Sequence, residues 1–521
     1  MRQRRLRSAT LAAARPDVGR PGYDRDETRI GIVHFGPGAF HRAHQAWYVD
    51  RLLEHDPRWA ICGVSLKSAA ARAALAPQDF LYTLVELGEE TRLRVIGSLR
   101  ELWVAPRHRS RVLERLIAPE VRLVTLTITE KGYCLDATGR LDERHPDIAH
   151  DLEQPRKPVS ALGWLAAGLR ERRALGLPPF TVMSCDNLPD NGPTLRRALA
   201  AYARRLDADL ARWIEEEVAF PRTMVDSITP ATDDPLRARV AEALGLEDAW
   251  PVQREAFAQW VIEDLPAVRE ADWAAVGATL VSDVGVYDRA KLRLVNGAHS
   301  TLAYVGLLRG RETVAEAMND APLARFLERL MREDIAPTVG NSAAGAWPAA
   351  DGAAHRASPR TSPAGGSPPA GASPQGLDVP AYIDVVLGRL RNPSMRHALA
   401  QIAWDGSKKL PVRLIGTIED RLQAGAPVAR LAVPVAAWMR FVARQAKAGV
   451  PIVDPDADRL TAVGLASTGE PRDDIERFVA LGTVIPPALA ALPAFARALE
   501  DAYRQLGAAA QIEGFDFGGA P

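Results

Sequence analysis

The apolar pattern of this chain changes once, close to Tyr287, and that change limits the folds open to it. Between Arg29 and about Val286, short β-like apolar runs alternate with segments of helical period, as in a mainly parallel sheet covered by helices. The clearest predicted strands are RIGIVHF, WAICGVSL, VRLVTLTIT and FTVMSCD. After Tyr287 the period is helical. We therefore predict an α/β fold class, with an α/β domain over 29–286 and a mainly α-helical domain over 287–521.

The composition points to a small-molecule partner. Lys plus Arg and Asp plus Glu both number 65, so no basic field draws the protein to nucleic acid or to an anionic membrane. The three cysteines are widely separated, which argues against a disulfide framework and a cysteine-rich zinc site, and favours a reducing cytoplasm. The longest apolar tract, 479–499, contains three prolines and Arg497, so we predict buried helices rather than a membrane span.

Two segments fall outside these domains. Residues 1–28 form a basic leader whose apolar stretch is too short and too polar for a signal-peptide core, and we predict a disordered tail. Residues 338–375 are dense in Ala, Gly, Pro and Ser and cannot bury enough apolar surface to offset the entropy of ordering. We predict a disordered insertion there, inside the helical domain.

A glycine turn follows the first predicted strand and precedes the helix-compatible segment HRAHQAWYVDRLLE. In this context, backbone N–H groups and the helix N-terminus approach a pyrophosphate closely. His41 stands where the third glycine of the dinucleotide fingerprint is expected, so an ordinary tight turn remains the alternative. The residues that we assign to a cofactor site here are Gly36, Gly38, Ala39, Phe40 and Arg42.

The second predicted strand ends without the carboxylate that usually binds the adenosine ribose. Ser65, Lys67 and Ser68 stand there instead. Lys67 is either a contact for a 2′-phosphate, which favours NADP, or a solvated loop lysine. We expect NAD as the cofactor, with NADP possible.

Three residues of AKLRLVNGAHSTLAYVG carry the predicted chemistry. At about 100° per residue, Lys291, Asn296 and His299 fall within an arc of roughly 140°, on one helical face. A lysine desolvated beside a cofactor has a lowered pKa and serves as a general base for an alcohol. We assign this base to Lys291, and an oxyanion-stabilising amide to Asn296. His299 either holds a substrate hydroxyl or is a packed histidine.

A second amide comes from SCDNLPDNG. Asn187 follows a predicted strand at its carboxyl end, where open α/β sheets place ligands, although the residue alone favours a turn-forming role beside Pro189 and Gly192. Tyr287 and Lys291 also fit the YxxxK spacing of short-chain dehydrogenases. We interpret that match as coincidental, because the pair lies far from the glycine turn.

Six motifs in a fixed order resemble the polyol-specific long-chain dehydrogenases, the family of mannitol 2-dehydrogenase and fructuronate reductase. The resemblance covers roughly Arg29 to Ala510. The motifs are GPGAFHRAHQAWYVD, TITEKGYC, SCDNLPDNG, FPRTMVDSITPAT, QWVIED and KLRLVNGAHSTLAYVG. It implies a Rossmann-like N-terminal domain, a helical C-terminal domain, no metal, and a monomer or weak homo-oligomer.

The resemblance also implies roles for single residues. The family's lysine base matches Lys291, its two oxyanion asparagines match Asn187 and Asn296, and its substrate-binding histidine matches His299. Its acidic proton relay matches Asp288, although a helix-start aspartate is an equally good interpretation. A further acidic residue near the substrate matches Asp226; here Ser227 follows, where many members have arginine.

QIAWDGSKKLPVR looks closer to fructuronate reductases than to mannitol dehydrogenases. A uronate carries a carboxylate, and Lys409 and Arg413 are candidates to bind it, unless they belong to a solvated face. We therefore expect interconversion of D-fructuronate and D-mannonate. The alternatives are a mannitol 2-dehydrogenase, a tagaturonate reductase or, in another class, a dinucleotide-binding protein without catalysis.

Overall fold

The computed structural model describes residues 4–136, 138–340 and 376–508. The chain divides into two compact units, an N-terminal unit ending at Gly285 and a C-terminal unit beginning at Val286. Most of the predicted insertion, from 341 to 375, lies outside the described residues.

A five-stranded parallel sheet with strand order β5-β2-β1-β6-β7 forms the centre of the N-terminal unit. Four of its strands fall inside the predicted apolar runs; only β5 was not foreseen. The strands are β1 (Ile30–Phe35), β2 (Ala60–Ser65), β5 (Leu99–Val104), β6 (Leu123–Leu126) and β7 (Thr181–Ser184). The order runs outward from β1 in both directions, so the predicted Rossmann-like arrangement is confirmed.

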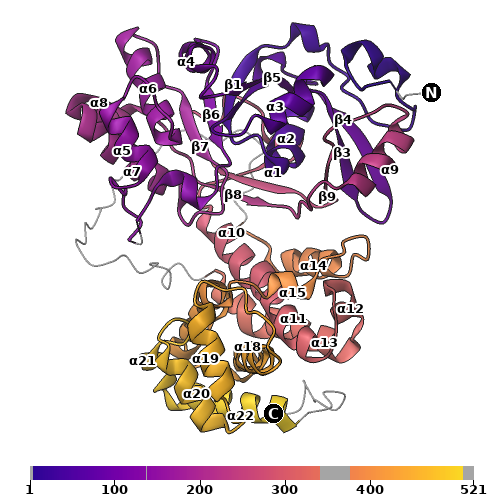
Figure 1. Ribbon diagram of the computed structural model, residues 1–521, viewed down its shortest axis with the longest axis vertical. Coiled ribbons are helices and arrows are strands. Elements are labelled where there is room, and N and C mark those ends of the chain that lie inside the picture. Colours follow the sequence, from indigo (N-terminus) through magenta and orange to yellow (C-terminus); the bar gives the residue numbers. More distant parts are fainter. Residues whose placement is uncertain (1–3, 137, 341–375, 509–521) are drawn as a thin grey trace, which may run out of the picture. The chain divides into compact units, whose positions relative to one another are not determined.

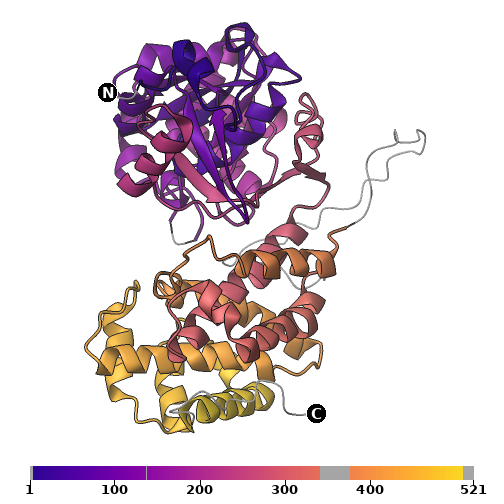
Figure 2. The same ribbon diagram turned by 90° about the vertical axis from the view of Figure 1, so that its right-hand side faces the viewer.

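Both faces of this sheet are buried, because alternate side chains of each strand join different cores. Val33 and Phe35 of β1 belong to one core, whereas Ile32 belongs to the other. Figures 1 and 2 show the strands enclosed by helices. The helices of this unit are α1 (Ala39–Ala43), α2 (Gln45–Leu52), α3 (Ala70–Leu75), α4 (Arg109–Ile117), α5 (Pro146–Glu153), α6 (Ala161–Ala174), α7 (Asn191–Leu206), α8 (Ala208–Glu217) and α9 (Asp234–Leu244).

Two smaller sheets, each of three strands, complete the N-terminal unit. One has the order β11-β10-β8 and the other the order β4-β3-β9. Their strands are β3 (Tyr82–Leu87), β4 (Thr91–Ile96), β8 (Thr223–Asp226), β9 (Val252–Glu255), β10 (Gln259–Glu263) and β11 (Thr279–Val281). Trp260 and Ile262 of β10 pack in the same core as Ile32, so this layer covers one face of the central sheet.

The predicted disordered tail is wrong for the residues from Arg4 to Thr28. Leu6, Ala14 and Val18 are buried against Leu81 and Leu244 in a small separate core. The backbone N–H of Leu6 also donates to the carbonyl of Glu247 at 2.8 Å. Three apolar residues spaced through a polar segment are enough to pack it, although they lie too far apart to form an apolar stretch in the sequence.

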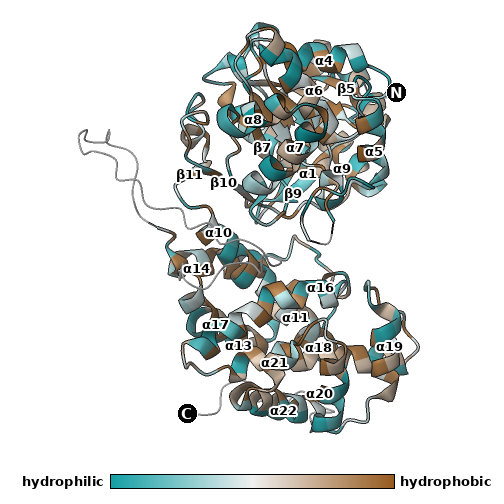
Figure 3. Ribbon diagram, turned by 90° about the vertical axis from the view of Figure 1, so that its left-hand side faces the viewer, coloured by the Kyte–Doolittle hydropathy of each residue, from teal (hydrophilic) through white to brown (hydrophobic). Residues whose placement is uncertain are grey.

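The C-terminal unit is helical, as predicted, and no named strand occurs among its described residues. A single core links α11 (Gly297–Leu308) with α18 (Ala429–Lys447), whose apolar residues appear brown in Figure 3. Its other α-helices are α10 (Gly285–Ala290, which starts one residue before the unit), α12 (Val314–Asn319), α13 (Ala321–Arg329), α14 (Val379–Leu390), α15 (Leu399–Ile402), α16 (Gly406–Leu410), α17 (Gly416–Gln423), α19 (Ala457–Ala466), α20 (Pro471–Ala480), α21 (Pro487–Ala490) and α22 (Pro493–Ala508).

The apolar tract 479–499 is divided among α20, α21 and α22, and its side chains Ile485, Phe495 and Leu499 are buried in the C-terminal core. A proline begins each of these three helices, and Pro487 and Pro493 lie within the tract, which explains why the tract does not form one continuous helix. In the described parts of the chain, no helix combines the length and the apolar character that crossing a membrane requires.

Candidate active site

The carboxyl ends of β1, β6 and β7 lie side by side at one edge of the central sheet. Phe35 is level with Leu126, and Leu126 with Ser184. The strand order reverses between β1 and β6, and in open α/β sheets ligands bind outside such a point. The loops that follow these strands are therefore the natural place for a cofactor.

The glycine turn stands at this point, and the two glycines are required for different reasons. Gly36 has φ +90°, and a Cβ on it would lie 2.1 Å from the carbonyl oxygen of Thr127 in the loop after β6. A Cβ on Gly38 would meet nothing closer than the Gly36 oxygen at 3.8 Å. Gly36 thus lets β1 and β6 approach each other, and Gly38 leaves open space above the turn. This geometry fits a pyrophosphate held by backbone N–H groups.

A buried histidine supports the turn from below. His34 Nε2 lies 2.9 Å from Thr127 Oγ1 and 3.2 Å from the Gly36 carbonyl oxygen, and His34 Nδ1 lies 2.7 Å from Thr125 Oγ1. Burial lowers the pKa of His34 to about 3. The ring of His41 stacks on it with centroids 3.4 Å apart, and burial lowers the pKa of His41 as well. Both rings are therefore neutral near pH 7.

The helix after the turn differs from the prediction in two ways. It is interrupted at His44, which separates α1 from α2. Arg42 is 1% exposed, and its guanidinium donates to the Trp250 carbonyl at 2.7 Å and lies over the Tyr82 ring. Arg42 is thus held inside the unit and is not available to a cofactor, contrary to our assignment. Ala39 and Phe40 remain partly exposed at the start of α1.

The loop after β2 carries Lys67 as predicted, and the structure gives this lysine a carboxylate partner. Lys67 Nζ lies 3.0 Å from Asp147 Oδ2 in the first turn of α5, with the lysine side chain 76% exposed. Ser65 Oγ donates to the Ser68 carbonyl at 2.6 Å and holds the loop closed. The sequence analysis found no acidic residue at the end of β2; α5 brings one there.

Asp186, which sequence reasoning missed, organises the loops beside Asn187. Its carboxylate accepts the backbone N–H groups of Ile128 and Thr129, both at 2.9 Å, and the Tyr133 hydroxyl at 2.8 Å. Thr129 has φ +63°, a conformation that non-glycine residues rarely adopt. The loop after β6 is thus fixed against the end of β7, and the exposed Asn187 follows directly at this edge.

Asn191 was also missed, although it lies in the quoted motif SCDNLPDNG. Its Nδ2 donates to the Thr223 carbonyl at 2.9 Å, and its Oδ1 accepts the Thr223 N–H at 3.0 Å, which fixes the start of β8 beside the end of β7. β8 ends at Asp226, which is 6% exposed. Ser227, which follows, donates through Oγ to the Phe257 carbonyl at 3.0 Å.

In the C-terminal unit, α10 and α11 form one helix interrupted by a π-helical segment, Lys291–Asn296. The uniform step of 100° that we assumed is therefore wrong for these six residues. Hydrogen bonds from residue i to i+5 bring the sixth residue back almost above the first, so Lys291 and Asn296 share one side of the helix more closely than an α-helix allows. Asp288 precedes the segment and is partly buried, and the buried His299 follows it in α11.

A second π-helical segment, Pro411–Ile415, packs against the first at Gly297. A Cβ on Gly297 would lie 3.2 Å from the Arg413 carbonyl oxygen, so the glycine permits the close approach. Arg413 Nη1 lies 3.1 Å from Ser300 Oγ and 3.5 Å from the Asn296 carbonyl oxygen. The structure thus brings Arg413 to the helix that carries Lys291, Asn296 and His299.

Two arginines on the π segments differ in their charge partners. Arg293 forms an ion pair with Asp420 at 2.5 Å. Arg413 has no carboxylate within ion-pair distance among the described residues, and burial lowers its pKa to about 10. Burial and the Arg413 charge both lower the pKa of Lys409, whose nearest carboxylate, that of Asp405, lies at 4.0 Å. Lys409 and Arg413, both predicted site residues, thus form a part-buried pair of cations whose charge nearby carboxylates neutralise only in part.

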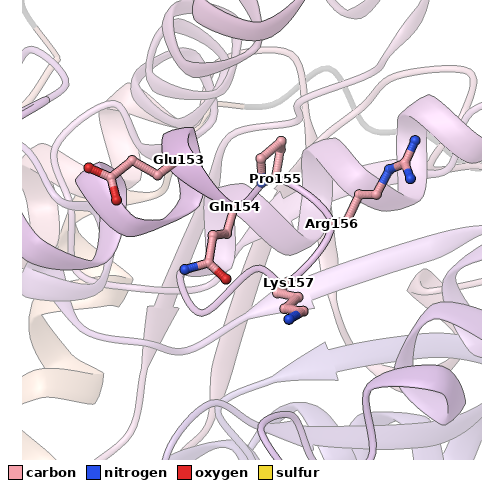
Figure 4. A pocket seen from close by; sticks show the side chains of 5 residues that line it. All are labelled: Glu153, Gln154, Pro155, Arg156 and Lys157. Atoms are coloured by element: carbon pink, nitrogen blue, oxygen red, sulfur yellow. The ribbon is translucent and has the colours of Figure 1, made fainter.

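A surface pocket lies elsewhere, in the loop after α5. It is lined by Glu153, Gln154, Pro155, Arg156 and Lys157, whose side chains spread away from one another in Figure 4. Because these side chains do not converge, they offer a ligand no defined set of contacts. The edge of the central sheet is therefore the better candidate for a binding site.

The N-terminal unit has a parallel sheet with a glycine turn at its switch point, which is typical of dinucleotide binding. The C-terminal unit carries lysine, asparagine and histidine on one helix, which are residues that suit proton transfer to and from an alcohol. Together the two units define the class of two-domain dehydrogenases. Residues 30–274 match the Mannitol dehydrogenase Rossmann domain, and residues 283–346 and 368–507 match the Mannitol dehydrogenase C-terminal domain. The chain therefore belongs to the mannitol dehydrogenase family and is an oxidoreductase acting on CH–OH groups.

Similar proteins extend over the whole length. The chain is 38% identical over 506 residues to a D-mannonate oxidoreductase of Escherichia coli, covering 95% of this chain and 97% of that protein. It is 37% identical to a mannitol 2-dehydrogenase of Phaeosphaeria nodorum, covering 92% and 83%. Among solved structures, the Pseudomonas fluorescens mannitol 2-dehydrogenase in complex with NAD and D-mannitol aligns with a TM-score of 0.75 at 36% identity, covering 96% of both chains.

Proposed function

We propose that this protein interconverts D-fructuronate and D-mannonate. The observation that carries the proposal is Arg413, a part-buried guanidinium with no ion-pair partner among the described residues, beside Lys409 and the helix of Lys291. A buried charge is costly unless it is paired, and a sugar-acid carboxylate would complete the pair by charge-assisted hydrogen bonds. The similarity to a D-mannonate oxidoreductase over nearly the whole chain supports the same substrate class.

In the proposed reaction, Lys291 is the general base and acid. In the direction of alcohol oxidation, its neutral amine takes the hydroxyl proton; in reduction, its ammonium returns a proton to the carbonyl oxygen. The nicotinamide supplies or accepts the hydride. Asn296 and Asn187 donate amide hydrogen bonds to the oxygen as it becomes negative, His299 and Asp226 hold substrate hydroxyls, and Asp288 relays the proton from Lys291 to solvent.

We also propose NAD as the preferred cofactor. Backbone N–H groups of the turn at Gly36 and Gly38 would bind the pyrophosphate, and the loop after β2 would meet the adenosine ribose. The Asp147 carboxylate, which pairs with Lys67 in this loop, would repel a 2′-phosphate bound there. A similar protein bound to NAD agrees with this preference.

The test is a spectrophotometric panel with the purified protein. Oxidation of NADH and of NADPH is followed with D-fructuronate, D-tagaturonate and D-fructose. The proposal predicts kcat/KM at least about tenfold higher for D-fructuronate than for D-fructose, and for NADH than for NADPH. Faster turnover of D-fructose would make the protein a mannitol 2-dehydrogenase, and faster turnover of D-tagaturonate would make it a tagaturonate reductase.

A neutral cofactor-site variant tests the coenzyme assignment separately. Asp147→Asn removes the carboxylate and leaves Lys67 in place, so the ratio of NADPH to NADH efficiency should rise by about tenfold. Lys67→Ala, in contrast, should leave the ratio of NADPH to NADH efficiency unchanged or lower it. If neither substitution changes the ratio, this ion pair plays no part in coenzyme choice.

A further inference from the structure

His397 is a polar residue that none of the predicted roles uses, yet it lies against one of the proposed substrate residues. It stands in the loop before α15, and its ring contacts that of His299 edge to face, with centroids 5.3 Å apart and planes at 64°. The two rings come from segments separated by almost a hundred positions in the chain.

The backbone holds His397 in a fixed position. Its carbonyl accepts the Val314 N–H at 3.0 Å, and its own N–H donates to the Met395 carbonyl at 2.9 Å. The next residue, Ala398, forms a β-bridge with Thr313. A histidine whose backbone is fixed on both sides can present its ring with little ordering of the loop on binding.

The polar edge of this ring is incompletely used. His397 Nδ1 is buried and has no hydrogen-bond partner among the described residues. Leaving such an atom without a partner costs about 1 to 3 kcal/mol, a cost that an apolar side chain in the same place would avoid. Burial and the neighbouring Lys409 charge lower the pKa of His397, so the ring is neutral near pH 7.

Around His397, the groups available to a ligand favour oxygen-rich anions. Lys409 and Arg413 are cationic donors, and a neutral imidazole adds one donor and one acceptor. Of the nearby carboxylates, that of Asp454 is engaged, because it accepts the Ser407 N–H at 2.8 Å, and that of Asp405 comes no closer to Lys409 than 4.0 Å. A carboxylate flanked by a hydroxyl is the ligand that such a set of groups matches best.

We propose that His397 is a specificity-determining residue that binds the acid end of the substrate, together with Lys409 and Arg413. His397 donates to a carboxylate oxygen or to the hydroxyl beside it, while the adjoining His299 holds a hydroxyl nearer the reacting carbon. This inference rests on the proposed function and deepens it, because it assigns selection of sugar acids over neutral polyols to a particular side chain.

The experiment compares His397→Ala, His397→Asn and His397→Gln in the full-length protein. Steady-state kinetics are measured with D-fructuronate and D-fructose, with NADH saturating. We expect His397→Ala to raise KM for D-fructuronate by about tenfold, with kcat within about twofold and with KM for D-fructose unchanged. Asn places an amide near Nδ1 and Gln near Nε2, so one of them should restore KM and identify the nitrogen that binds.

The exposed His55 supplies the matched control, because His55→Gln should leave every parameter unchanged. An equal rise in KM for both substrates, with a lowered melting temperature, would show that His397 only packs against His299 and would overturn the inference. Unchanged KM for D-fructuronate in all three variants would also overturn it while leaving the proposed function intact.

A second measurement distinguishes failure of the proposed function from failure of the inference about His397. It applies if the wild-type protein reduces only D-fructose. In that case the proposed function is wrong, and inhibition of D-fructose reduction by D-mannonate tests His397 directly. Inhibition that weakens about tenfold in His397→Ala would support binding of a sugar acid at this residue. Equal inhibition of both proteins, or none, would refute it.

Discussion

The pyrophosphate contacts proposed in the N-terminal unit are backbone groups, whereas the substrate contacts proposed in the C-terminal unit are side chains. Gly36 and Gly38 act through the absence of a side chain. Asp186 fixes the loop after β6 by accepting hydrogen bonds from the backbone N–H groups of that loop. Lys291, Asn296 and Arg413 instead work through their own functional groups, presented by π-helical segments.

The difference corresponds to the chemistry assigned to each unit. A pyrophosphate is the same in every dinucleotide, so a fixed backbone cradle can bind it. A substrate is distinguished by the placement of single oxygens, which requires donors at particular points. Substitutions should therefore act differently in the two regions: added atoms should damage the N-terminal region, and removed functional groups should damage the C-terminal region.

The largest expected effect is in the C-terminal region, at Lys291. Lys291→Ala should lower kcat by about 10³-fold while leaving the melting temperature within a few degrees, because general acid–base catalysis contributes about 10² to 10⁴. Single-turnover kinetics with D-fructuronate and NADH measure the loss. Lys408→Ala, at an exposed lysine of α16, is the control. A loss below tenfold in a folded protein would exclude Lys291 as the base.

A pair of added methyl groups tests the N-terminal region. Gly36→Ala should destabilise the protein by about 3 kcal/mol or more, because φ +90° is strained for alanine and its Cβ would meet the Thr127 oxygen. Gly38→Ala should leave the melting temperature nearly unchanged, because its Cβ points into open space above the turn. It should weaken NADH binding by about tenfold, because that space is where the pyrophosphate is proposed to bind. Thermal melts and fluorescence titrations measure the two effects. Equal behaviour of both variants would contradict the backbone cradle.

The third prediction concerns substrate selection at Arg413. Arg413→Met should lower kcat/KM for D-fructuronate by about 30-fold, the value of one lost charge-assisted hydrogen bond of about 2 kcal/mol. Arg413→Lys should fall between wild type and Arg413→Met, because it keeps the charge but not the planar fork. D-Fructose is the comparison substrate, and its kcat/KM should change less than threefold. A parallel loss for D-fructose would indicate that Arg413 acts by holding Ser300 and the Asn296 backbone.

The fold was largely predictable from the sequence because each unit repeats one apolar period. Alternating runs predicted four strands of the central sheet, and the glycine turn after Phe35 could be placed at its edge. β5 was missed because LRELWV has charged residues between apolar ones and lies at the end of the sheet. The packing of Leu6, Ala14 and Val18 was missed because it depends on distant residues such as Leu244.

The predicted site residues stand near the ends of strands, on the helix of Lys291 or in the neighbouring segment from Lys409 to Arg413, but their partners were not predictable. Periodicity cannot show a π-helical segment, because the change from i+4 to i+5 hydrogen bonds at Lys291 leaves the apolar pattern almost unaltered. Arg42 lies in the motif of the turn, yet its contacts with Trp250 and Tyr82 come from residues far along the chain. The pairing of Lys67 with Asp147 was hidden for the same reason.

The smallest expected effect is a pH dependence that belongs to the N-terminal region. Because burial lowers the pKa of folded His34 to about 3, the unfolded chain, with an ordinary pKa near 6.5, binds a proton that the folded chain does not. The contribution to stability is complete above about pH 6.5 and is lost as the pH falls toward 3. For this one group, the loss between pH 7 and pH 5.5 is about 1 kcal/mol.

A difference between two proteins isolates that contribution. His34→Gln removes the titrating group. Between pH 7 and pH 5.5, the free energy of unfolding of the variant should therefore fall by about 1 kcal/mol less than that of the wild-type protein. This difference holds even if the variant is less stable at both pH values. Urea unfolding at both pH values measures the difference, and hydrogen exchange in peptides covering Ile30–Phe35 locates it. Exchange around α11 should differ little between the two proteins, because His34 acts within the N-terminal unit. An identical pH dependence in both would mean that His34 is protonated in the folded state, and a charged ring would then lie directly beneath the glycine turn.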